Sequence, residues 1–315
     1  MKLKMWSKVN IKMEKEDFEL ILFDRIEIIK SANKKYDLEN NAYISFSGGK
    51  DSTILHYLVD MALPDNKIPR VFINTGIEYN YIVEFVNELA SKDDRFVILK
   101  PTQAIKPMLE KVGYPFKSKE HSNYLSVYQH CGLESKTADR YLNPSEKRKK
   151  YGCPTFLKYQ FTKEFNLKIS NLCCYKLKKE PIKNWQKQNN RSITLTGMRK
   201  DEKGTRANIQ GCIITDKANK IVKFHPLLVV NDDFENWFIE KNNIKLCKLY
   251  YEPFNFKRTG CKGCPFALDL QEQLTIMNTY LPNERKQCEM IWEPVYKEYR
   301  RLGYRLSKKE QCKLF

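Results

Sequence analysis

The chain alternates short apolar runs with segments in which apolar residues recur at helical spacing. Residues 13–36 are such a segment, with apolar side chains at Phe18, Leu20, Ile21, Phe23, Ile26 and Ile29. This spacing predicts a helix before the first strand. Runs rich in β-branched and aromatic residues predict four strands, at 42–46, 71–74, 96–99 and 192–196. A helix is expected over 79–89, and the chain from residue 269 onward is expected to be helical.

Strands that alternate with helices indicate an α/β fold, in which helices flank a parallel sheet and ligands bind at the carboxyl ends of the strands. We expect an N-terminal helical segment at 1–40, an α/β domain at 41–268 and a helical C-terminal region at 269–315. Residues 113–152 are polar and contain the basic run 146–150. We therefore expect this segment to be an irregular insertion or lid rather than part of the core.

Residues 47–52 read Ser-Gly-Gly-Lys-Asp-Ser and join the first strand to a helical pattern. The glycines allow a sharp turn and a close approach to a ligand. Free N–H groups at the helix start favour an anion, and Lys50 adds a positive charge. The spacing differs from the Walker loop, which has four residues between its first glycine and a Gly-Lys pair. The sequence thus predicts a phosphate cradle, and the alternative is a plain Gly-Gly turn. The candidate binding residues are Ser45, Ser47, Gly48, Gly49, Lys50, Asp51 and Ser52.

The hexapeptide resembles the PP-loop of the N-type ATP pyrophosphatases. Enzymes of that group cleave ATP between the α and β phosphates, adenylate a substrate and release pyrophosphate. The resemblance implies an adenine-nucleotide α-hydrolase-like, Rossmann-like fold, with ATP and Mg²⁺ as ligands. It also implies that Lys50 holds the leaving pyrophosphate and that Asp51 helps to position Mg²⁺.

Three later segments are similar to the phosphoadenosine-phosphosulfate (PAPS) reductase branch of that superfamily. Residues 74–79 resemble its D-T-G-x-E/F-x element, although Asn74 replaces the aspartate and removes a charge; Thr75 and Gly76 match. Residues 196–206 resemble its G-x-R-x-x-E/Q-S…R segment, and residues 225–237 its P-L-x-x-W…D-V stretch. The resemblance runs from about residue 40 to residue 267.

The second of these segments contributes Gly197, Arg199 and Arg206 to the candidate site. Two arginines that follow a strand suit bidentate capture of phosphate or sulfate. The resemblance implies that they balance the charge that develops at the α phosphate.

Ten cysteines occur in a chain without a recognisable secretory signal, so metal ligation, redox chemistry or burial are more plausible than disulfides. Cys173 and Cys174 are adjacent, and Cys261 and Cys264 form a CxxC turn far downstream. This arrangement resembles the [4Fe–4S] ligand set of adenosine-phosphosulfate (APS) reductases, with lysines nearby to offset the cluster's charge. A four-cysteine zinc site and unrelated buried thiols are the alternatives. Three other cysteines are alternative ligands, namely Cys131, Cys153 and Cys212, whereas buried thiols are expected at Cys247 and Cys288.

The end of the chain bears on the choice between a reductase and an ATP user. Reductases of this branch end in Glu-Cys-Gly-Leu/Ile-His, whereas this chain ends Glu-Gln-Cys312-Lys-Leu-Phe, which leaves Cys312 as a candidate nucleophile. The complete loop at 47–52 favours a bound triphosphate. Together with the cysteines, it resembles ATP-dependent sulfurtransferases, including the cluster-bearing proteins of nucleic-acid thiolation and DNA phosphorothioation. A PAPS or APS reductase and a non-catalytic nucleic-acid-binding regulator are the alternatives.

The charge balance extends the list of expected partners. Lys and Arg number 56 against 38 Asp and Glu, a formal net charge of +18. Such a field attracts nucleotides and nucleic acid such as tRNA or DNA, although a lysine-rich composition without a polyanion partner explains it equally well. A sulfur donor protein is another expected partner. No long apolar run suggests a membrane span, and a cytoplasmic location is expected. The sulfur acceptor and the oligomeric state stay open.

Overall fold

The strands are ordered in one six-stranded sheet. The computed structural model describes residues 15–202 and 208–308, and the strand order is β3-β2-β1-β4-β6-β5. The strands are β1 (Ala42–Ser45), β2 (Arg70–Ile73), β3 (Phe96–Leu99), β4 (Ile193–Leu195), β5 (Ile213–Thr215) and β6 (Ile221–Phe224). Strand β1 is parallel to β4, and β4 is parallel to β6. The structure therefore confirms the predicted α/β class and the four predicted strands.

Two strands of the sheet were not predicted. Strand β5 runs antiparallel to β6, with Ile213 opposite Phe224, so the sheet is mostly rather than entirely parallel. All residues of β5 are exposed or half-buried. Ile213 and Ile214 are apolar and β-branched, but a three-residue strand is shorter than the runs of about four to eight residues by which strands are recognised.

The chain folds as two compact units, which are described separately. Among the described residues, the first comprises 15–70 with 190–202 and 208–246, and the second comprises Val71–Asn189 with 247–308. The domain limits predicted from the sequence, near residues 40 and 268, stay predictions.

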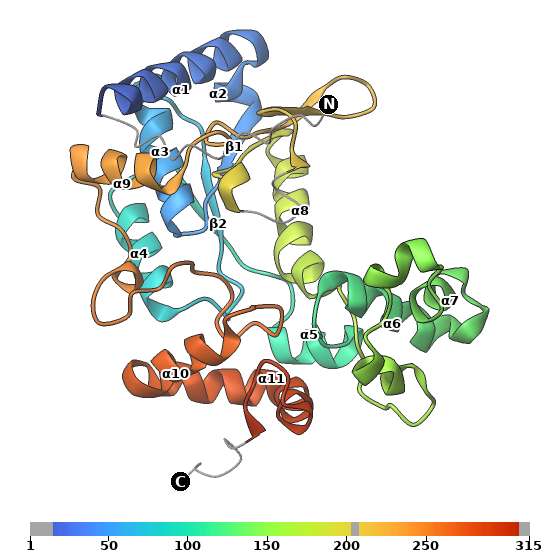
Figure 1. Cartoon of the computed structure of the whole chain (residues 1–315). Coiled ribbons are helices and arrows are strands. Elements are labelled where there is room, and N and C mark those ends of the chain that lie inside the picture. Colours follow the sequence, from blue (N-terminus) through green and yellow to red (C-terminus); the bar gives the residue numbers. More distant parts are fainter. Residues whose placement is uncertain (1–14, 203–207, 309–315) are drawn as a thin grey trace, which may run out of the picture. The chain divides into compact units, whose positions relative to one another are not determined.

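In the first unit, helix α3 packs against both α1 and α9 (Figure 1). Its helical elements are α1 (Lys15–Tyr36), α2 (Leu38–Asn41), α3 (Lys50–Ala62), the 3-10 turn η5 (Lys200–Glu202) and α9 (Asp232–Lys241). The ring of Phe18 in α1 lies 6.3 Å from that of Phe234 and 5.6 Å from that of Trp237 in α9. The helix predicted over 13–36 is thus confirmed as α1. Its Phe18 side chain packs against α9, and α9 is the helix that faces the candidate phosphate loop.

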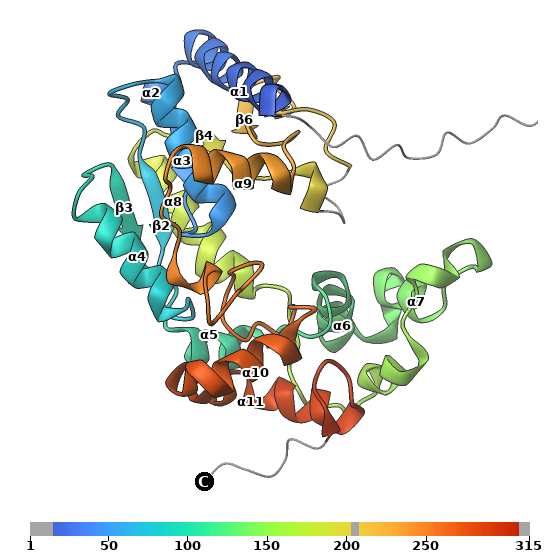
Figure 2. The ribbon, with the colours of Figure 1, turned by 60° about the vertical axis from the view of Figure 1, so that its left-hand side comes forward.

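The second unit is mostly helical, and Figure 2 shows its last two helices side by side. Its longer helices are α4 (Asn80–Ala90), α5 (Ile105–Val112), α6 (Lys119–Cys131), α7 (Lys136–Leu142), α8 (Glu180–Gln188), α10 (Leu270–Tyr280) and α11 (Pro282–Leu302). Its shorter turns are η1 (Gly132–Glu134), η2 (Glu146–Tyr151), η3 (Thr155–Phe161), the π-helical η4 (Tyr175–Lys179) and η7 (Lys248–Tyr250). The helix expected over 79–89 is confirmed, and the helical character expected from residue 269 onward is confirmed as far as Leu302, whereas residues 309–315 lie outside the described part of the chain.

The expectation that residues 113–152 are irregular was wrong. This segment contains α6 and α7, each begun by a serine whose hydroxyl accepts backbone N–H groups, at Ser118 and Ser135. His121 is fully buried and makes hydrogen bonds of 2.9 Å to Tyr141 Oη and 2.8 Å to Gln160 Oε1. His121 and its polar partners therefore satisfy one another inside a small core, which is why a polar composition did not mean irregular structure. Its role as an insertion or lid stays a prediction.

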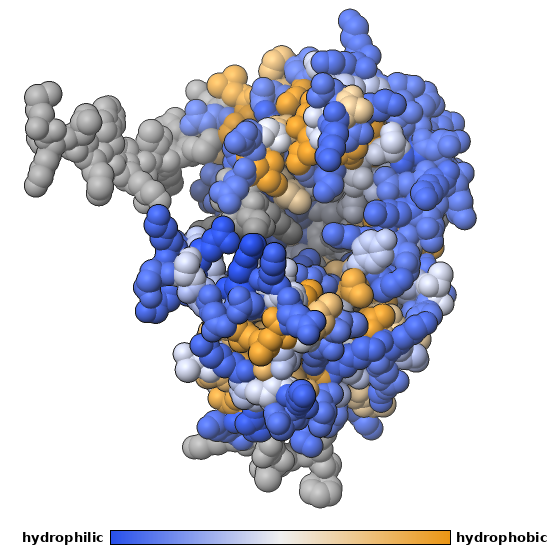
Figure 3. Space-filling view, turned by 90° about the vertical axis from the view of Figure 1, so that its right-hand side faces the viewer, coloured by the Kyte–Doolittle hydropathy of each residue, from blue (hydrophilic) through white to orange (hydrophobic). Residues whose placement is uncertain are grey.

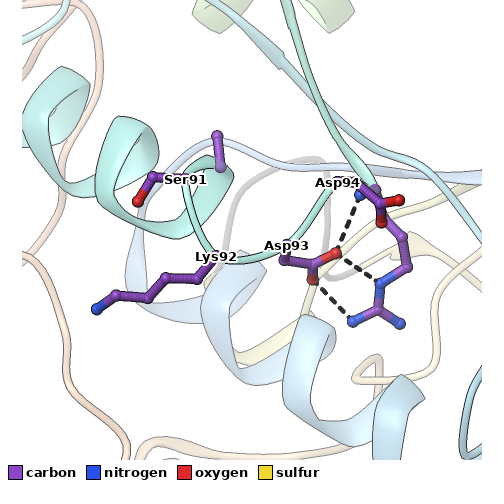
Figure 4. A pocket seen from close by; sticks show the side chains of 6 residues that line it. Ser91, Lys92, Asp93 and Asp94 are labelled. Atoms are coloured by element: carbon purple, nitrogen blue, oxygen red, sulfur yellow. Dashed lines mark hydrogen bonds and ion pairs between the residues drawn. The ribbon is translucent and has the colours of Figure 1, made fainter.

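Across residues 15–202 and 208–308, no helix combines the length and the apolar character that a bilayer crossing needs. Figure 3 shows a face that is mostly hydrophilic, with hydrophobic residues in separate patches. Figure 4 shows a surface pocket lined by residues 90–95, in which the Arg95 guanidinium donates hydrogen bonds to the Asp93 carboxylate. It contains none of the predicted site residues.

Candidate functional site

The loop at 47–52 is shaped by its own serines. Gly48 has φ +72°, a conformation that favours glycine. The Ser52 hydroxyl accepts the Ser47 N–H at 3.2 Å and donates to the Gly49 carbonyl at 2.9 Å. The Ser47 and Ser52 hydroxyls are 3.0 Å apart. The loop thus follows β1, which ends at Ser45, and delivers Lys50 as the first residue of α3.

Lys50 is held by two carboxylates of α9. Its Nζ lies 2.8 Å from Glu235 Oε2 and 3.5 Å from Asp232 Oδ1. The Lys50 side chain is 18% exposed, the Glu235 side chain is 0% exposed and the Asp232 side chain is 65% exposed. One partner of the lysine is therefore completely enclosed, and the other faces solvent.

The same two carboxylates hold Arg199. Its Nε lies 3.1 Å from Glu235 Oε1, and its Nη2 donates to Asp232 Oδ1 at 2.8 Å. The Nε atom is also 3.6 Å from Asp51 Oδ1. Burial opposes the charged form of Arg199, but these carboxylates outweigh it and raise the pKa of the guanidinium. The structure thus brings together three residues predicted as catalytic, Lys50, Asp51 and Arg199, and Arg206 lies outside the described residues.

Glu235 is a residue of this site that the sequence reasoning missed. Burial, followed by the nearby Asp51, raises the pKa of Glu235 to about 7, although Lys50 and Arg199 act in the opposite direction. By contrast, the pKa of Asp232 is lowered, because Arg199 and Lys50 outweigh its partial burial. The available signal was the position of Glu235, which follows Phe234 and lies on the same face of α9 as Phe238. Because glutamate is rarely fully buried unless it is paired, a glutamate on this apolar face indicates a buried cationic partner.

Gly197 lets the loop after β4 lie directly against the start of α3. A Cβ atom at this position would be 2.5 Å from the Asp51 carbonyl oxygen and 2.7 Å from the Asp51 carbonyl carbon. Only glycine fits there without a backbone shift. The predicted site residue Gly197 therefore sets the distance at which Arg199, two residues later, meets Asp51.

Asn74, Thr75 and Gly76 belong to the second unit and form a turn after β2. The Thr75 N–H and hydroxyl both donate to Glu78 Oε2 at 2.7 Å. The Gly76 N–H donates to Asn74 Oδ1 at 3.1 Å, and Gly76 has φ +82°. The Asn74 amide oxygen therefore supports the turn without the charge of an aspartate. The role of these three residues in nucleotide binding stays a prediction.

The four cysteines predicted as ligands influence one another's ionisation. The Cys173 thiol donates to the Cys174 sulfur, which with nearby Lys119, Lys178 and Lys179 lowers the pKa of Cys174 to about 6, against the opposing effect of burial. The same hydrogen bond, burial and the other three sulfurs raise the pKa of Cys173. Burial raises the pKa of Cys261, and it raises that of Cys264 to about 12. The two motifs, far apart in the sequence, therefore lie within electrostatic reach of each other.

Lys178 connects the turn after β2 to this group of cysteines. Its Nζ lies 3.3 Å from Glu78 Oε1 and forms a hydrogen bond with the Cys261 sulfur. Burial disfavours the charged form of Lys178, but Cys261 and Glu78 together raise its pKa. Glu78 therefore accepts hydrogen bonds from Thr75 and also pairs with Lys178, which in turn contacts Cys261.

Helix α11 anchors the CxxC turn through aromatic side chains. Trp292 Nε1 donates to the Lys262 carbonyl at 3.3 Å, and Tyr299 Oη donates to the Pro265 carbonyl at 2.8 Å. Tyr296 Oη donates to the Gly263 carbonyl. A Cβ atom at Gly263 would be 2.8 Å from Cys288 Sγ. The turn that carries Cys261 and Cys264 is therefore held by hydrogen bonds from α11.

The remaining cysteines have separate surroundings. Cys131 is exposed, Cys153 is buried with its pKa raised to about 11 by burial, and Cys212 lies 3.6 Å from Arg25 Nη1. Cys247 and Cys288 are buried, as expected. Within the described part of the chain, no three His, Cys, Asp or Glu side chains are arranged to hold one metal ion. The cluster ligands therefore stay predictions, and Cys312 lies outside the described residues.

Comparisons with known proteins identify similar families and folds. Residues 41–136 and 124–267 match the model of the phosphoadenosine phosphosulfate reductase domain. An uncharacterized protein of Methanocaldococcus jannaschii is 26% identical over 275 residues, which cover 84% of this chain and 53% of that protein. The chain thus spans about half the length of this curated relative.

Solved structures with a similar fold include two enzymes of low sequence identity. The PAPS reductase of Candida auris, in a phosphate complex, has a TM-score of 0.46 and 15% identity over 80% of this chain and 98% of that chain. The NH3-dependent NAD synthetase of Campylobacter jejuni has a TM-score of 0.40 and 13% identity over 88% of this chain and 94% of that chain.

Proposed function

The chain belongs to the phosphoadenosine phosphosulfate reductase domain family, and from this membership we propose that it is an ATP-dependent sulfurtransferase. It binds ATP at residues 47–52 and cleaves it to AMP and pyrophosphate. The observation that carries this proposal is the convergence of Lys50 and Arg199 on one buried carboxylate beside the start of α3. Two cations and a helix N-terminus at one place suit a polyphosphate.

The proposed reaction assigns a role to each described residue. Lys50 and the N–H groups at the start of α3 hold the β and γ phosphates, and Asp51 would help to position a bound Mg²⁺. An oxygen of the acceptor attacks the α phosphorus, and the bond from that phosphorus to the bridging oxygen of the β phosphate breaks. Pyrophosphate leaves, and Arg199 balances the charge that develops at the α phosphate. A sulfur nucleophile then displaces AMP from the adenylated acceptor. At a carbon centre a carbon–oxygen bond breaks and a carbon–sulfur bond forms, and at a phosphorus centre a phosphorus–oxygen bond breaks and a phosphorus–sulfur bond forms.

The cysteines fit an iron–sulfur cluster by the chemistry of their donors. Thiolates are the ligands that such clusters take, and Cys173, Cys174, Cys261 and Cys264 are the residues that would hold a [4Fe–4S] cluster. Lys178, in contact with Cys261, would offset part of its negative charge. A bound cluster would supply a place to hold or deliver sulfur.

A nucleic-acid acceptor is supported by the exposed basic turn η2. Its residues from Glu146 to Tyr151 are all exposed, and four of them are Lys or Arg. Lys150 lies over the Tyr151 ring at 4.9 Å, so a cation and an aromatic face are presented together. Phosphates and unstacked bases are recognised by this pair of groups. We propose tRNA or DNA as the acceptor class.

The products of ATP turnover test the proposal. The purified protein is incubated with MgATP, a sulfur source and total tRNA or DNA, and the nucleotides are separated by chromatography. AMP with pyrophosphate is the expected result, and ADP would contradict it. The competing reductase function predicts thioredoxin-dependent sulfite release from APS or PAPS, which Cys312→Ser abolishes.

A further inference from the structure

Glu235 has an unusual position for a carboxylate beside a proposed phosphate site. It is fully buried, it contacts Lys50 at 2.8 Å and it contacts Arg199 at 3.1 Å. Without a nucleotide, these two cations would be left facing each other across the start of α3. A carboxylate between them removes that repulsion. Glu235 thus stands where an anion is needed before a ligand arrives.

The same carboxylate becomes unfavourable once phosphates bind. A triphosphate at residues 47–52 would draw Lys50 and Arg199 toward its own oxygens and would bring several negative charges close to Glu235. A buried carboxylate that loses its cationic partners and gains anionic neighbours is more stable in its neutral form. Accepting one proton is the means by which it can lose its charge without leaving the core.

We propose that Glu235 is the internal counter-ion of the phosphate cradle, which holds Lys50 and Arg199 before a nucleotide binds and takes up a proton from solvent as the phosphates replace it. This inference rests on the proposed binding of ATP at residues 47–52. The step forms one O–H bond on Glu235, and the proton comes from water or buffer. Glu235 acts on the ligand through Lys50 and Arg199, so it is a positioning residue.

The groups that face Glu235 support this role. From α3 these are Lys50 and Asp51, from the loop after β4 Arg199, and from its own helix Asp232. Burial, followed by Asp51, raises the pKa of Glu235 to about 7, so proton uptake needs only a modest further shift near neutral pH. The pKa of Asp232 is lowered, and its side chain is 65% exposed. Asp232 therefore stays ionised and serves as a matched control, because it contacts the same two cations.

Calorimetric titration with MgATP at about pH 8, in buffers of different ionisation enthalpy, measures the protons taken up on binding. The wild-type protein is expected to take up a substantial fraction of one proton per ATP. Glu235→Gln, which keeps the shape of the side chain, is expected to lose that uptake, whereas Asp232→Asn is expected to retain it.

The outcomes separate this inference from the proposed function. ATP binding by the wild-type protein without proton uptake, or with uptake that survives in a folded Glu235→Gln variant, overturns the role of Glu235 and leaves the ATP site intact. Proton uptake that disappears in Asp232→Asn assigns the proton to the exposed Asp232 carboxylate and also overturns the role of Glu235. A wild-type protein that does not bind MgATP overturns both proposals.

Discussion

Gly197 lies so close to Asp51 that a single added carbon would collide with the main chain. The nearest atoms to a Cβ at this position are the carbonyl oxygen and carbon of Asp51, at 2.5 and 2.7 Å. Since backbone atoms cannot rotate away as a flexible side chain can, the loop after β4 and the start of α3 are fixed against each other at this contact. This contact positions Arg199 beside the proposed phosphate loop.

Gly197→Ala is therefore expected to weaken ATP binding at least about tenfold and to destabilise the fold by about 1–3 kcal/mol, typical of overpacking. Calorimetry and thermal unfolding measure the two effects. Gly211→Ala is the matched control, because its nearest neighbour would be the Ile213 carbonyl oxygen at 3.9 Å. A Gly197→Ala variant that binds ATP as tightly as the control would show that this contact does not shape the site.

The proposed cluster predicts the metal content of protein purified without oxygen. About four iron atoms per chain and absorbance near 400 nm are expected. Cys261→Ser should lose most of the iron, whereas Cys131→Ser should keep it, because Cys131 is exposed and has no part in the Cys173 group. Stoichiometric zinc in place of iron would contradict the cluster and leave a structural metal site.

The exposed turn η2 predicts salt-dependent binding of nucleic acid. Replacing Lys147, Arg148, Lys149 and Lys150 by alanine should weaken tRNA or DNA binding and reduce the slope of its salt dependence by about 0.9 for each lost phosphate contact. The matched control removes four lysines elsewhere, namely Lys34, Lys35, Lys67 and Lys92, for the same change in net charge. Equal losses in the two variants would indicate a non-specific effect of total charge.

The buried His121 predicts a loss of stability in acid. Burial lowers the pKa of His121 to about 4, from an ordinary value of 6.5. Between these two pH values the unfolded chain binds a proton that the folded chain does not, so stability falls as the pH falls, by at most about 3 kcal/mol. Urea unfolding at several pH values should show this loss in the wild-type protein.

His121→Gln is expected to flatten that part of the pH profile. His130→Gln is the control, since His130 is exposed on the same helix. A pH profile that is the same for wild-type protein and His121→Gln would show that His121 does not set the acid stability of this segment.

The sequence was a good guide where one local pattern determines the structure. The apolar runs that became β1 and β3 and the helically spaced apolar residues that became α1 were recognisable as local patterns, although Leu20 and Phe23 of α1 are exposed. Strand β5 was missed because its apolar run is only three residues long. Residues 113–152 were misjudged because the partners of His121 lie at Tyr141 and Gln160, far along the chain.

The candidate site shows the same division. Lys50 and Arg199 were predicted from motifs, but their shared partner Glu235 belongs to a helix about 35 residues beyond Arg199, which no local pattern connects to the loop. Similarly, the hydrogen bonds that α11 donates to the CxxC turn depend on folded geometry. Sequence motifs identified the candidate phosphate-binding residues, and tertiary contacts determined which of the charged side chains form ion pairs.

Binding of ATP to the wild-type protein and to Lys50→Ala tests the central claim most directly. Lys50 is proposed to make charge-assisted hydrogen bonds to the phosphates, each worth about 1.5–3 kcal/mol, so calorimetry should show affinity lower by at least about tenfold in Lys50→Ala. Lys30→Ala, which removes an exposed, ion-paired lysine of α1, should bind as the wild-type protein does. Equal ATP affinity in Lys50→Ala and Lys30→Ala would contradict the assignment of residues 47–52 as the phosphate site.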